Sequence, residues 1–446
     1  MGILGDHIFL SRLQFGFMAL FHILWPVLSI GLSLFIFTME ALYLKLGDSR
    51  YYRQARFWTR IFLLNFGIGV ASGIPLEFAF GTNWAPFSRV AGDLIGSTLG
   101  FEAAMAFMLE AGFIGIMAFG WERTRPGTHL FATGMVGLGA SLSSFWIMAA
   151  NAWMQAPAGW RWLDGRLVID SFSRAVFNPD TAAAALHMWF AAMMTTCLVV
   201  GGVSAWYILR ARAPALFNLS FRWAVGVLIV VAPVQIFLGD VSGRGVAERQ
   251  WVKLAAMEAH WRTNLPGAGA PFVVLAWPDM AARMNRLALE VPDGLSLLVT
   301  HSLTGEVRGL EGVASQDMPP VRLTFFAFRL MILSGVLTLF LSLWSALCWL
   351  RGGLGLERLM ARRGLLRAWI CAMPLGYIGV ETGWITRETG RQPWLVQDLF
   401  RTADGASRLP AETVLSSLVL YGLVYGIILA AFAVFMVRLL RAGPQK

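Results

Sequence analysis

Residues 13–42 read LQFGFMALFHILWPVLSIGLSLFIFTMEAL, an apolar run whose ionisable residues are His22 and Glu40. With a rise of about 1.5 Å per residue, a helix of this length crosses a hydrocarbon core of about 30 Å. Because lipid offers no partners to backbone groups, the run predicts a membrane-spanning helix. It is too long for the apolar part of a signal peptide, so we expect it to be retained.

Further apolar runs follow along the chain, and together they predict an all-α integral membrane protein with about nine transmembrane helices. The composition agrees, because 57% of the 446 residues are hydrophobic and only 14% are charged, against about 25% charged residues in soluble domains. The mean hydropathy is +0.62. A soluble enzyme is therefore excluded. The predicted spans are 13–42, 57–80, 95–120, 130–152, 183–209, 220–240, 324–350, 367–388 and 413–440.

The net charge of +10 would suggest a nucleic-acid partner in a soluble protein, but here its distribution across the membrane is decisive. The loops and tail on one side of the spans hold 18 Lys and Arg, and the short segments on the other side hold 9. The positive-inside rule then predicts an N-terminus outside, a cytoplasmic C-terminus and no nucleic-acid partner. The three cysteines show no paired spacing, so neither a disulfide framework nor a zinc site is indicated.

The predicted spans divide the chain into three parts: helices 1–6 in 1–240, a long polar loop in 241–323, and helices 7–9 in 324–446. The loop holds 8 basic and 8 acidic residues and 6 of the 18 prolines. It falls on the outer face in the predicted topology. Loops of this length are uncommon unless they have a function.

Ionisable side chains inside the predicted spans are the functional candidates, because a charge at mid-bilayer costs about 2.5–3.5 kcal/mol. They are His22, Glu77, Glu102, Glu110, His187 and Glu381. Counting residues from the outer edge of each span places His187 and Met331 at a similar depth, and the remaining outer-half groups, His22, Glu102 and Glu381, in the same layer.

A His and Met pair fits a haem iron that is closed on both sides, while single His or Glu ligands could leave an axial position open for a gas. Each of these residues also has a simpler interpretation. A buried His often bonds a neighbouring helix, Met commonly fills gaps in packing, and Glu can pair helices or relay protons. The residues alone leave both a haem protein and a proton-coupled transporter without a redox cofactor open, and they favour the transporter.

Eight sequence blocks, in order and spread over nearly the whole chain, resemble subunit I of the cytochrome bd-type quinol oxidases. The most specific are KLAAMEAHW, from Lys253 to Trp261, and the GRQPW part of ETGWITRETGRQPW, from Glu381 to Trp394. The others are SRLQFGFMALFH (11–22), EFAFGTNW (77–84), FEAAMAFMLE (101–110), ANAWMQ (150–155), GDVSG (239–243) and FAFRLM (326–331).

The resemblance implies three haems and a quinol site. His187 and Met331 match the ligands of a low-spin haem b, with Arg329 beside it. A second set matches ligands shared between a high-spin haem b and a high-spin haem d, or a further haem b in its place: His22, Glu102 and Glu381, with Arg391 in the GRQPW block. A third set matches residues that handle quinol and protons: Lys253 and Glu258 in the outer loop, called the Q-loop, and Glu110 with Ser143 on the cytoplasmic proton path.

The activity implied is that of the haem-bearing catalytic subunit of a bacterial quinol:oxygen oxidoreductase in the plasma membrane. It would oxidise quinol at the outer face and reduce O2 to water with protons taken from the cytoplasm. Subunit II is the implied partner, and a small accessory subunit stays open. A haem b protein that transfers electrons without reducing oxygen is the remaining alternative.

Spacing adds two geometric expectations. Lys253 and Glu258 are about 140° apart on an ideal helix, so we expect them to flank a quinol and not to pair. Glu102 and Glu110 are about 12 Å and 80° apart, a gap that water or the Ser143 hydroxyl could bridge.

Two features depart from the family pattern. Tyr377 stands where the family often has Trp, which could alter packing or electron transfer near the high-spin haems. The segment 301–318 leaves no room for the long insertion of some members. The short segment resembles the short Q-loop branch, which includes cyanide-insensitive oxidases.

Overall fold

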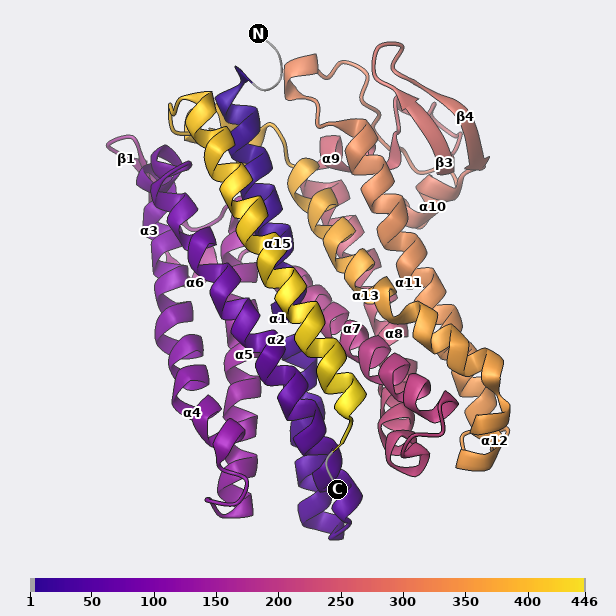
Figure 1. The fold of residues 1–446 in the computed structure, drawn as a ribbon. Coiled ribbons are helices and arrows are strands. Elements are labelled where there is room, and N and C mark those ends of the chain that lie inside the picture. Colours follow the sequence, from indigo (N-terminus) through magenta and orange to yellow (C-terminus); the bar gives the residue numbers. More distant parts are fainter. Residues whose placement is uncertain (1–4, 445–446) are drawn as a thin grey trace.

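The computed structural model describes residues 5–444, which form a bundle of long helices with a small folded cap at one end (Figure 1). The long helices are α1 (His7–Leu46), α2 (Ser49–Gly81), α3 (Ala85–Phe101) continued by the π-helix η2 (Glu102–Phe107) and α4 (Met108–Phe119), α5 (Pro126–Gln155), α7 (Thr181–Leu209), α8 (Pro214–Arg249), α11 (Val321–Leu350), α13 (Arg363–Thr389) and α15 (Ala411–Ala442).

Short elements connect the long helices. They are the hairpin β1 (Trp160–Leu163) and β2 (Arg166–Ile169), α6 (Phe172–Val176), α9 (Trp251–Glu258), the hairpin β3 (Phe272–Asp279) and β4 (Met284–Val291), α10 (Gly294–Thr300), the 3₁₀-helix η3 (Ser315–Asp317), α12 (Leu356–Ala361), the pair β5 (Trp394–Val396) and β6 (Phe400–Arg401), and α14 (Thr402–Gly405). All three strand pairs are antiparallel.

The prediction of an all-α membrane protein is confirmed. Within residues 5–444, eight helices are long and apolar enough to cross a membrane. The remaining predicted span, 367–388, corresponds to α13, a helix of 27 residues that packs against α7 and α11. Its sequence carries five charged residues, Arg363, Arg367, Glu381, Arg387 and Glu388, and it is not among those eight helices.

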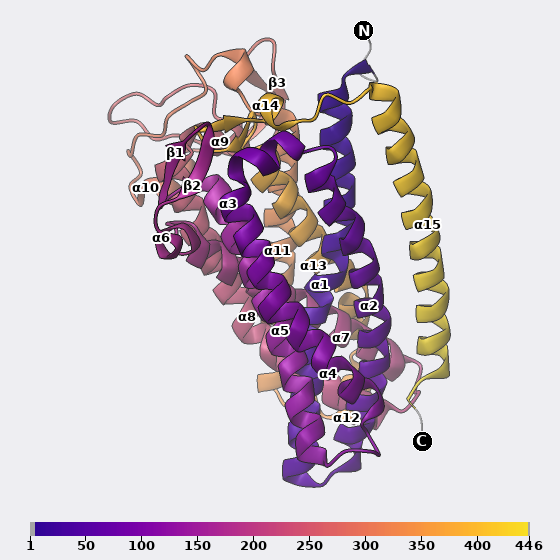
Figure 2. The ribbon, with the colours of Figure 1, turned by 90° about the vertical axis from the view of Figure 1, so that its left-hand side faces the viewer.

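The helices α1 and α7 form the centre of the bundle. Helix α1 packs against α2, α5 and α7, and α7 packs against α8 and α13 as well. Helix α15 lies at the edge of the bundle (Figure 2), where it packs against α1 and α2. Of its residues, Val414 and Tyr425 are buried, and many of its large apolar side chains are exposed. The two ends of the described chain lie at opposite ends of the bundle, since α1 begins at the top of Figure 1 and α15 ends at the bottom.

The predicted loop 241–323 is shorter and more ordered than its composition indicates. Helix α8 continues through Arg249, and α9, the β3–β4 hairpin and α10 follow. These elements form a cap at the end of the bundle where α1 begins (Figure 1). Its core includes Ala255, Trp261, Val273 and Phe325, so the cap packs on the first turns of α11.

Glycines allow the central helix α7 to approach its neighbours closely. A Cβ added to Gly31 of α1 would lie 2.3 Å from Thr196 Oγ1, and one added to Gly376 of α13 would lie 2.6 Å from Thr195 Cα. Neither distance leaves room for a side chain. Small residues at such contacts permit the close packing that holds membrane helices together.

We predict that Gly376→Ala destabilises the protein by about 1–3 kcal/mol, the usual cost of overpacking, because the new methyl group meets the α7 backbone. Thermal unfolding in detergent should show a lower Tm. Gly422→Ala on α15 is the matched control, since no atom lies within 4 Å of its added Cβ. An unchanged Tm for Gly376→Ala would contradict the close contact.

Candidate functional site

Lys253 and Glu258 lie on the short helix α9 and have different partners, as their spacing predicts. Lys253 Nζ donates to Gln155 Oε1 at 2.9 Å, and Glu258 Oε2 accepts from Arg329 Nη2 at 2.6 Å. Both side chains belong to residues that are only 4% exposed, although they lie in the cap and not in a membrane span. The sequence alone favours a solvated helix here, and the burial argues against that interpretation.

Burial changes the protonation of both side chains. Burial lowers the pKa of Lys253 to about 7, and the positive charge of Arg387 lowers it further, while Glu388 and Asp180 act in the opposite direction. Burial raises the pKa of Glu258, and the ion pair with Arg329 offsets part of that shift. Lys253 can therefore gain or lose a proton near neutral pH.

Arg329 connects the cap to the membrane helices. Its Nε donates to the Val273 carbonyl of β3 at 2.7 Å, and its guanidinium lies 4.6 Å from the ring centres of both Phe272 and Phe325. Its Nη1 is buried without a hydrogen-bond partner. Arg329 precedes Met331 by two residues, so the α9 site adjoins the predicted low-spin ligands.

His187 of α7 faces α8. Its Nε2 lies 3.2 Å from Gln235 Nε2, its Nδ1 is buried without a partner, and its Cε1 would lie 3.5 Å from a Cβ on Gly239. A histidine with one unpartnered buried nitrogen is a candidate ligand, because buried polar atoms normally have partners.

Met331 of α11 lies against the neighbouring helix α13, where a Cβ on Gly383 would be 3.1 Å from its sulfur. One turn further along α11, a Cβ on Gly335 would be 3.6 Å from Ile236, the residue after the partner of His187. His187 and Met331 therefore belong to the same four-helix group, α7, α8, α11 and α13, at related levels.

His22 of α1 faces α2. Its Nδ1 lies 3.0 Å from Ser72 Oγ, and a Cβ on Gly73 would lie 3.0 Å from its Cε1. The hydroxyl of Ser72 also donates to the Gly69 carbonyl, so Ser72 is oriented by its own helix. This hydrogen bond holds the His22 ring in one orientation.

Glu102 begins the π-helix η2, which the sequence pattern did not reveal. Its Oε1 accepts from Ser143 Oγ of α5 at 2.6 Å. The expected 80° offset between Glu102 and Glu110 does not hold, because it assumes a regular α-helix through residues 102–107. Single π-turns occur frequently at functional sites.

Glu110 of α4 is buried against α5, where a Cβ on Gly139 would lie 2.7 Å from its Cγ. Ser143, one turn further along α5, binds Glu102 and not Glu110. Glu102 is close enough to both Glu77 and Glu110 for their charges to repel. Glu77 itself lies on the exposed side of α2.

Helix α13 contains two glutamates in different surroundings. Glu381 has a buried Oε1 with no partner. Glu388, which the sequence pattern did not single out, accepts from Asn151 at 2.9 Å, from Gln155 at 3.3 Å and from Arg391. Its place in the ETGRQPW block, seven residues after Glu381, was the available signal.

Arg391 is almost completely buried. It donates to Glu388 and to the Leu395 carbonyl, and its Nε has no partner. Arg387, one turn earlier, donates to Asn151 at 2.6 Å and to Asp180 at 2.6 Å. A buried polar network therefore joins α13 to α5, to the start of α7 and, through Gln155, to Lys253.

The predicted iron ligands do not form one shared cluster. Across residues 5–444, no group of three or more His, Cys, Asp or Glu side chains could hold a single metal ion. His22, Glu102 and Glu381 lie on three different helices, and none is hydrogen-bonded to another within the described chain. Each could thus provide one axial ligand, but not part of a multidentate site.

Comparison with known proteins identifies the family. The model for "Cytochrome bd terminal oxidase subunit I" matches residues 10–444. The chain is 35% identical to the cytochrome bd-II ubiquinol oxidase subunit 1 of Escherichia coli K12, with 99% of this chain and 97% of that protein covered. It is 33% identical to the cytochrome bd ubiquinol oxidase subunit 1 of Bacillus subtilis 168, with 98% and 94% covered.

The fold agrees with that of a solved relative. The structure of the bd oxidase from Geobacillus thermodenitrificans superposes with a TM-score of 0.89 at 28% identity and covers 99% of both chains. The sequence blocks, the helix arrangement and these matches lead to one conclusion: the chain belongs to the cytochrome bd terminal oxidase subunit I family.

Proposed function

We propose that this chain oxidises quinol at its α9 cap and uses the electrons to reduce oxygen to water. Family membership makes it the catalytic subunit I of a cytochrome bd quinol oxidase, a multi-pass protein of a bacterial respiratory oxidase. The observation that carries the proposal is the Arg329–Glu258 ion pair, because it joins the proposed quinol site to the helix that bears Met331. Family membership also favours an oxidase over a cofactor-free transporter or an electron-transfer haem b protein.

The buried polar atoms of the α7, α8, α11 and α13 group fit a low-spin haem b. His187 and Met331 would hold the iron, and the unpartnered Nη1 of Arg329 is a free donor for an acidic haem group. Nothing lies within 4 Å of a Cβ built on Gly243, one turn of α8 beyond Gly239, the glycine that faces His187. When bound, the haems supply the one-electron chemistry that connects quinol to oxygen.

The high-spin pair would be held by His22, Glu102 and Glu381, with Arg391 nearby. One member would be a haem b and the other a haem d or a further haem b. The unpartnered Oε1 of Glu381 supports its role, because a buried carboxylate oxygen without a donor requires a partner. Glu388 already accepts hydrogen bonds from Arg391, Asn151 and Gln155. These bonds favour a role in holding neighbouring side chains in place over a role as an iron ligand.

Lys253 and Glu258 would act on the quinol as proton acceptor and hydrogen-bond partner. Lys253, neutral in part near pH 7, can accept a proton from a quinol hydroxyl. Gln155 fixes its amine, and Arg329 fixes the Glu258 carboxylate. Both contacts orient the side chains before a substrate arrives, which lowers the entropy cost of the reaction.

Glu110, Glu102 and Ser143 would bring protons to the oxygen site. Ser143 already donates to Glu102, and Glu110 lies against the same helix one turn below. The positive-inside count supports a topology with this supply on the cytoplasmic side, and the α9 cap and the N-terminus outside. Quinol protons would then leave outside while oxygen protons enter from inside, so turnover would separate charge.

The complex would contain subunit II, and the chain would belong to the short Q-loop branch. The alignment with the Escherichia coli relative extends over 509 positions, more than the 446 residues of this chain, whereas the alignment with the Bacillus subtilis relative takes 449. The additional aligned positions indicate that the Escherichia coli relative contains insertions that this chain lacks, which supports the assignment to the short Q-loop branch.

We predict that His187→Ala and Met331→Ala each abolish the low-spin haem signature in the reduced-minus-oxidised spectrum, because each removes a side chain that would hold the iron. The purified two-subunit complex is measured by spectrum, haem extraction and quinol-driven oxygen uptake. Met194→Ala, a buried methionine on α7, is the control and should keep the signature. Normal spectra in both ligand variants would refute the pair, and a colourless wild-type complex would refute the proposed function.

The two α13 glutamates can be separated by substitution. We expect Glu381→Ala to remove one high-spin haem signal. We expect Glu388→Ala to retain that haem but to weaken its binding, since Glu388 has three protein partners. Loss of a residue that only orients the ligands typically costs about 10–100-fold in affinity or activity. Haem content by extraction provides the measurement. Loss of the signal in Glu388→Ala alone would transfer the ligand role to Glu388.

The pH dependence of quinol oxidation tests Lys253. Its pKa is lowered to about 7, so the ammonium form dominates below that pH and the proton-accepting amine above it. We therefore expect kcat/KM for quinol to rise between pH 6 and pH 8. Lys253→Met should lower kcat/KM for quinol by about 100-fold or more and remove its rise between pH 6 and pH 8. Lys45→Met, at the opposite end of the bundle from the α9 cap, should change neither kcat/KM nor its pH dependence. Persistence of the same pH step in Lys253→Met would exclude this assignment.

A further inference from the structure

Three buried polar side chains form a second cluster at the end of the bundle opposite the α9 cap. His129 Nδ1 lies 2.8 Å from Glu40 Oε2, and Thr133 Oγ1 donates to Glu40 Oε1 at 2.8 Å. Glu40 comes from α1, and the other two come from α5. We call Glu40, His129 and Thr133 the basal cluster; all three are at most 5% exposed.

One atom of the basal cluster has no partner. Both carboxylate oxygens of Glu40 accept a hydrogen bond, but His129 Nε2 is buried without one. An unpaired polar atom in a membrane helix is costly, so this nitrogen calls for a partner such as water, which could also exchange a proton with it. A cluster that only joined α1 to α5 would not need this second imidazole nitrogen.

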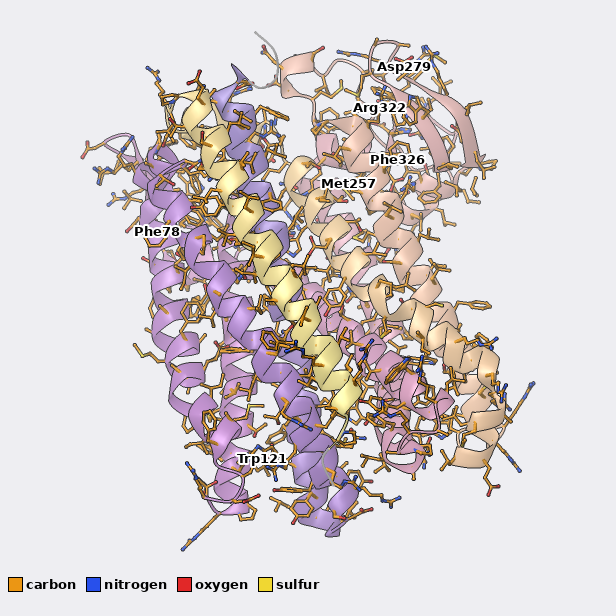
Figure 3. All side chains as sticks on the ribbon, viewed as in Figure 1. Phe78, Trp121, Met257, Asp279, Arg322 and Phe326 are labelled. Carbon is orange, nitrogen blue, oxygen red and sulfur yellow. The ribbon has the colours of Figure 1, made fainter. Side chains whose placement is uncertain are left out.

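A thin aromatic layer separates the basal cluster from the surface. The Trp121 ring centre lies 4.1 Å from that of His129, and the exposed Arg56 guanidinium lies 5.9 Å from the Trp121 ring. Arg56 also pairs with Glu122 at 3.2 Å. Figure 3 places Trp121 at the lower end of the bundle, far from Met257 and Asp279 of the cap.

The basal cluster shares one face of α5 with the proposed oxygen-side carboxylates. His129, Gly139 and Ser143 fall within a sector of about 80° on an ideal helix. Gly139 contacts Glu110 and Ser143 binds Glu102. From His129 the helix rises about 15 Å to Gly139 and about 6 Å more to Ser143. Ser33 of α1 is not on this route: its hydroxyl donates to the Ile30 carbonyl at 2.8 Å and faces Gly137, which is about 160° around α5 from Gly139.

We propose that Glu40, His129 and Thr133 form a proton-loading site that supplies Glu110 during oxygen reduction. This inference rests on the proposed function. Water at the base would give a proton to His129 Nε2, and the resulting imidazolium would be stabilised by the Glu40 carboxylate. Release of one proton inward through water, along the face of α5 that carries Gly139, towards Glu110 restores the neutral imidazole. Only N–H and O–H bonds form and break, and no electron moves.

Single-turnover proton uptake tests the proposal. The purified two-subunit complex, fully reduced and carrying CO, is placed in proteoliposomes and started by a flash in the presence of oxygen. A pH-sensitive dye reports proton uptake, and absorbance reports haem oxidation. We expect Glu40→Gln and His129→Gln to slow proton uptake on the order of 100-fold while haem content and the first haem oxidation step stay at wild-type values. Glu110→Ala should give the same pattern.

Gln54→Leu is the matched control. Gln54 is fully buried near the start of α2 and donates to the Leu216 carbonyl of α8 at 2.8 Å, so it joins two helices at the same end without belonging to the basal cluster. It should lower Tm and leave proton uptake unchanged. Wild-type uptake in both Glu40→Gln and His129→Gln would overturn the proposal and leave a helix-pairing role.

Two further measurements separate a folding defect from a failure of the proposal. If Glu40→Gln does not assemble, His129→Gln retains a hydrogen-bonding side chain for Glu40, and wild-type uptake in that variant alone overturns the proposal. If the wild-type complex shows no quinol-driven oxygen uptake, the proposed function fails instead. The two failures are therefore distinguishable.

Discussion

The close packing of α7 between α1 and α13 is the constraint on which the bundle depends. Thr195 faces Gly376 of α13 and Thr196 faces Gly31 of α1, and two more glycines of α7, Gly201 and Gly202, accommodate Trp369 and Met373. A helix held at several points by backbone contact cannot rotate about its axis without clashes. The direction of the His187 side chain, two turns nearer the cap, follows from this packing.

The ionisable residues are arranged by the cost of burying charge in lipid. At the cap end, Arg329 is paired with Glu258 and Arg387 with Asp180. At the other end, Glu40 is paired with His129. Between these ends, Glu102 has a single hydroxyl donor, and Glu381 keeps one oxygen without any. Unpartnered buried atoms therefore occur at two proposed haem ligands, His187 and Glu381, and also in the two charged pairs at the ends, at Arg329 and His129.

Much of the fold could be predicted because it follows from one-dimensional patterns. Apolar runs located the long helices, and the five-residue spacing of Lys253 and Glu258 correctly indicated that they do not pair. Helix ends were less predictable: α3 begins at Ala85 and α8 ends at Arg249, since polar residues there are satisfied by neighbouring elements. The network around Glu388 depends on contacts between residues more than 200 positions apart, and no local pattern contains that information.

The π-helix η2 gives the third long helix two different phases. In a π-helix the hydrogen bonds run from residue i to i+5 and not to i+4, so each turn contains more residues than an α-helical turn. Side chains after η2 therefore point in other directions than a continuous α-helix would give them. Helix α3 can therefore fit its side chains to the β1–β2 hairpin while α4 fits its own to α5. The two halves of this continuous helix can therefore pack against different neighbours independently. Glu102 is the first residue of the π-helix between them, so a shift of α3 or of α4 would move its carboxylate.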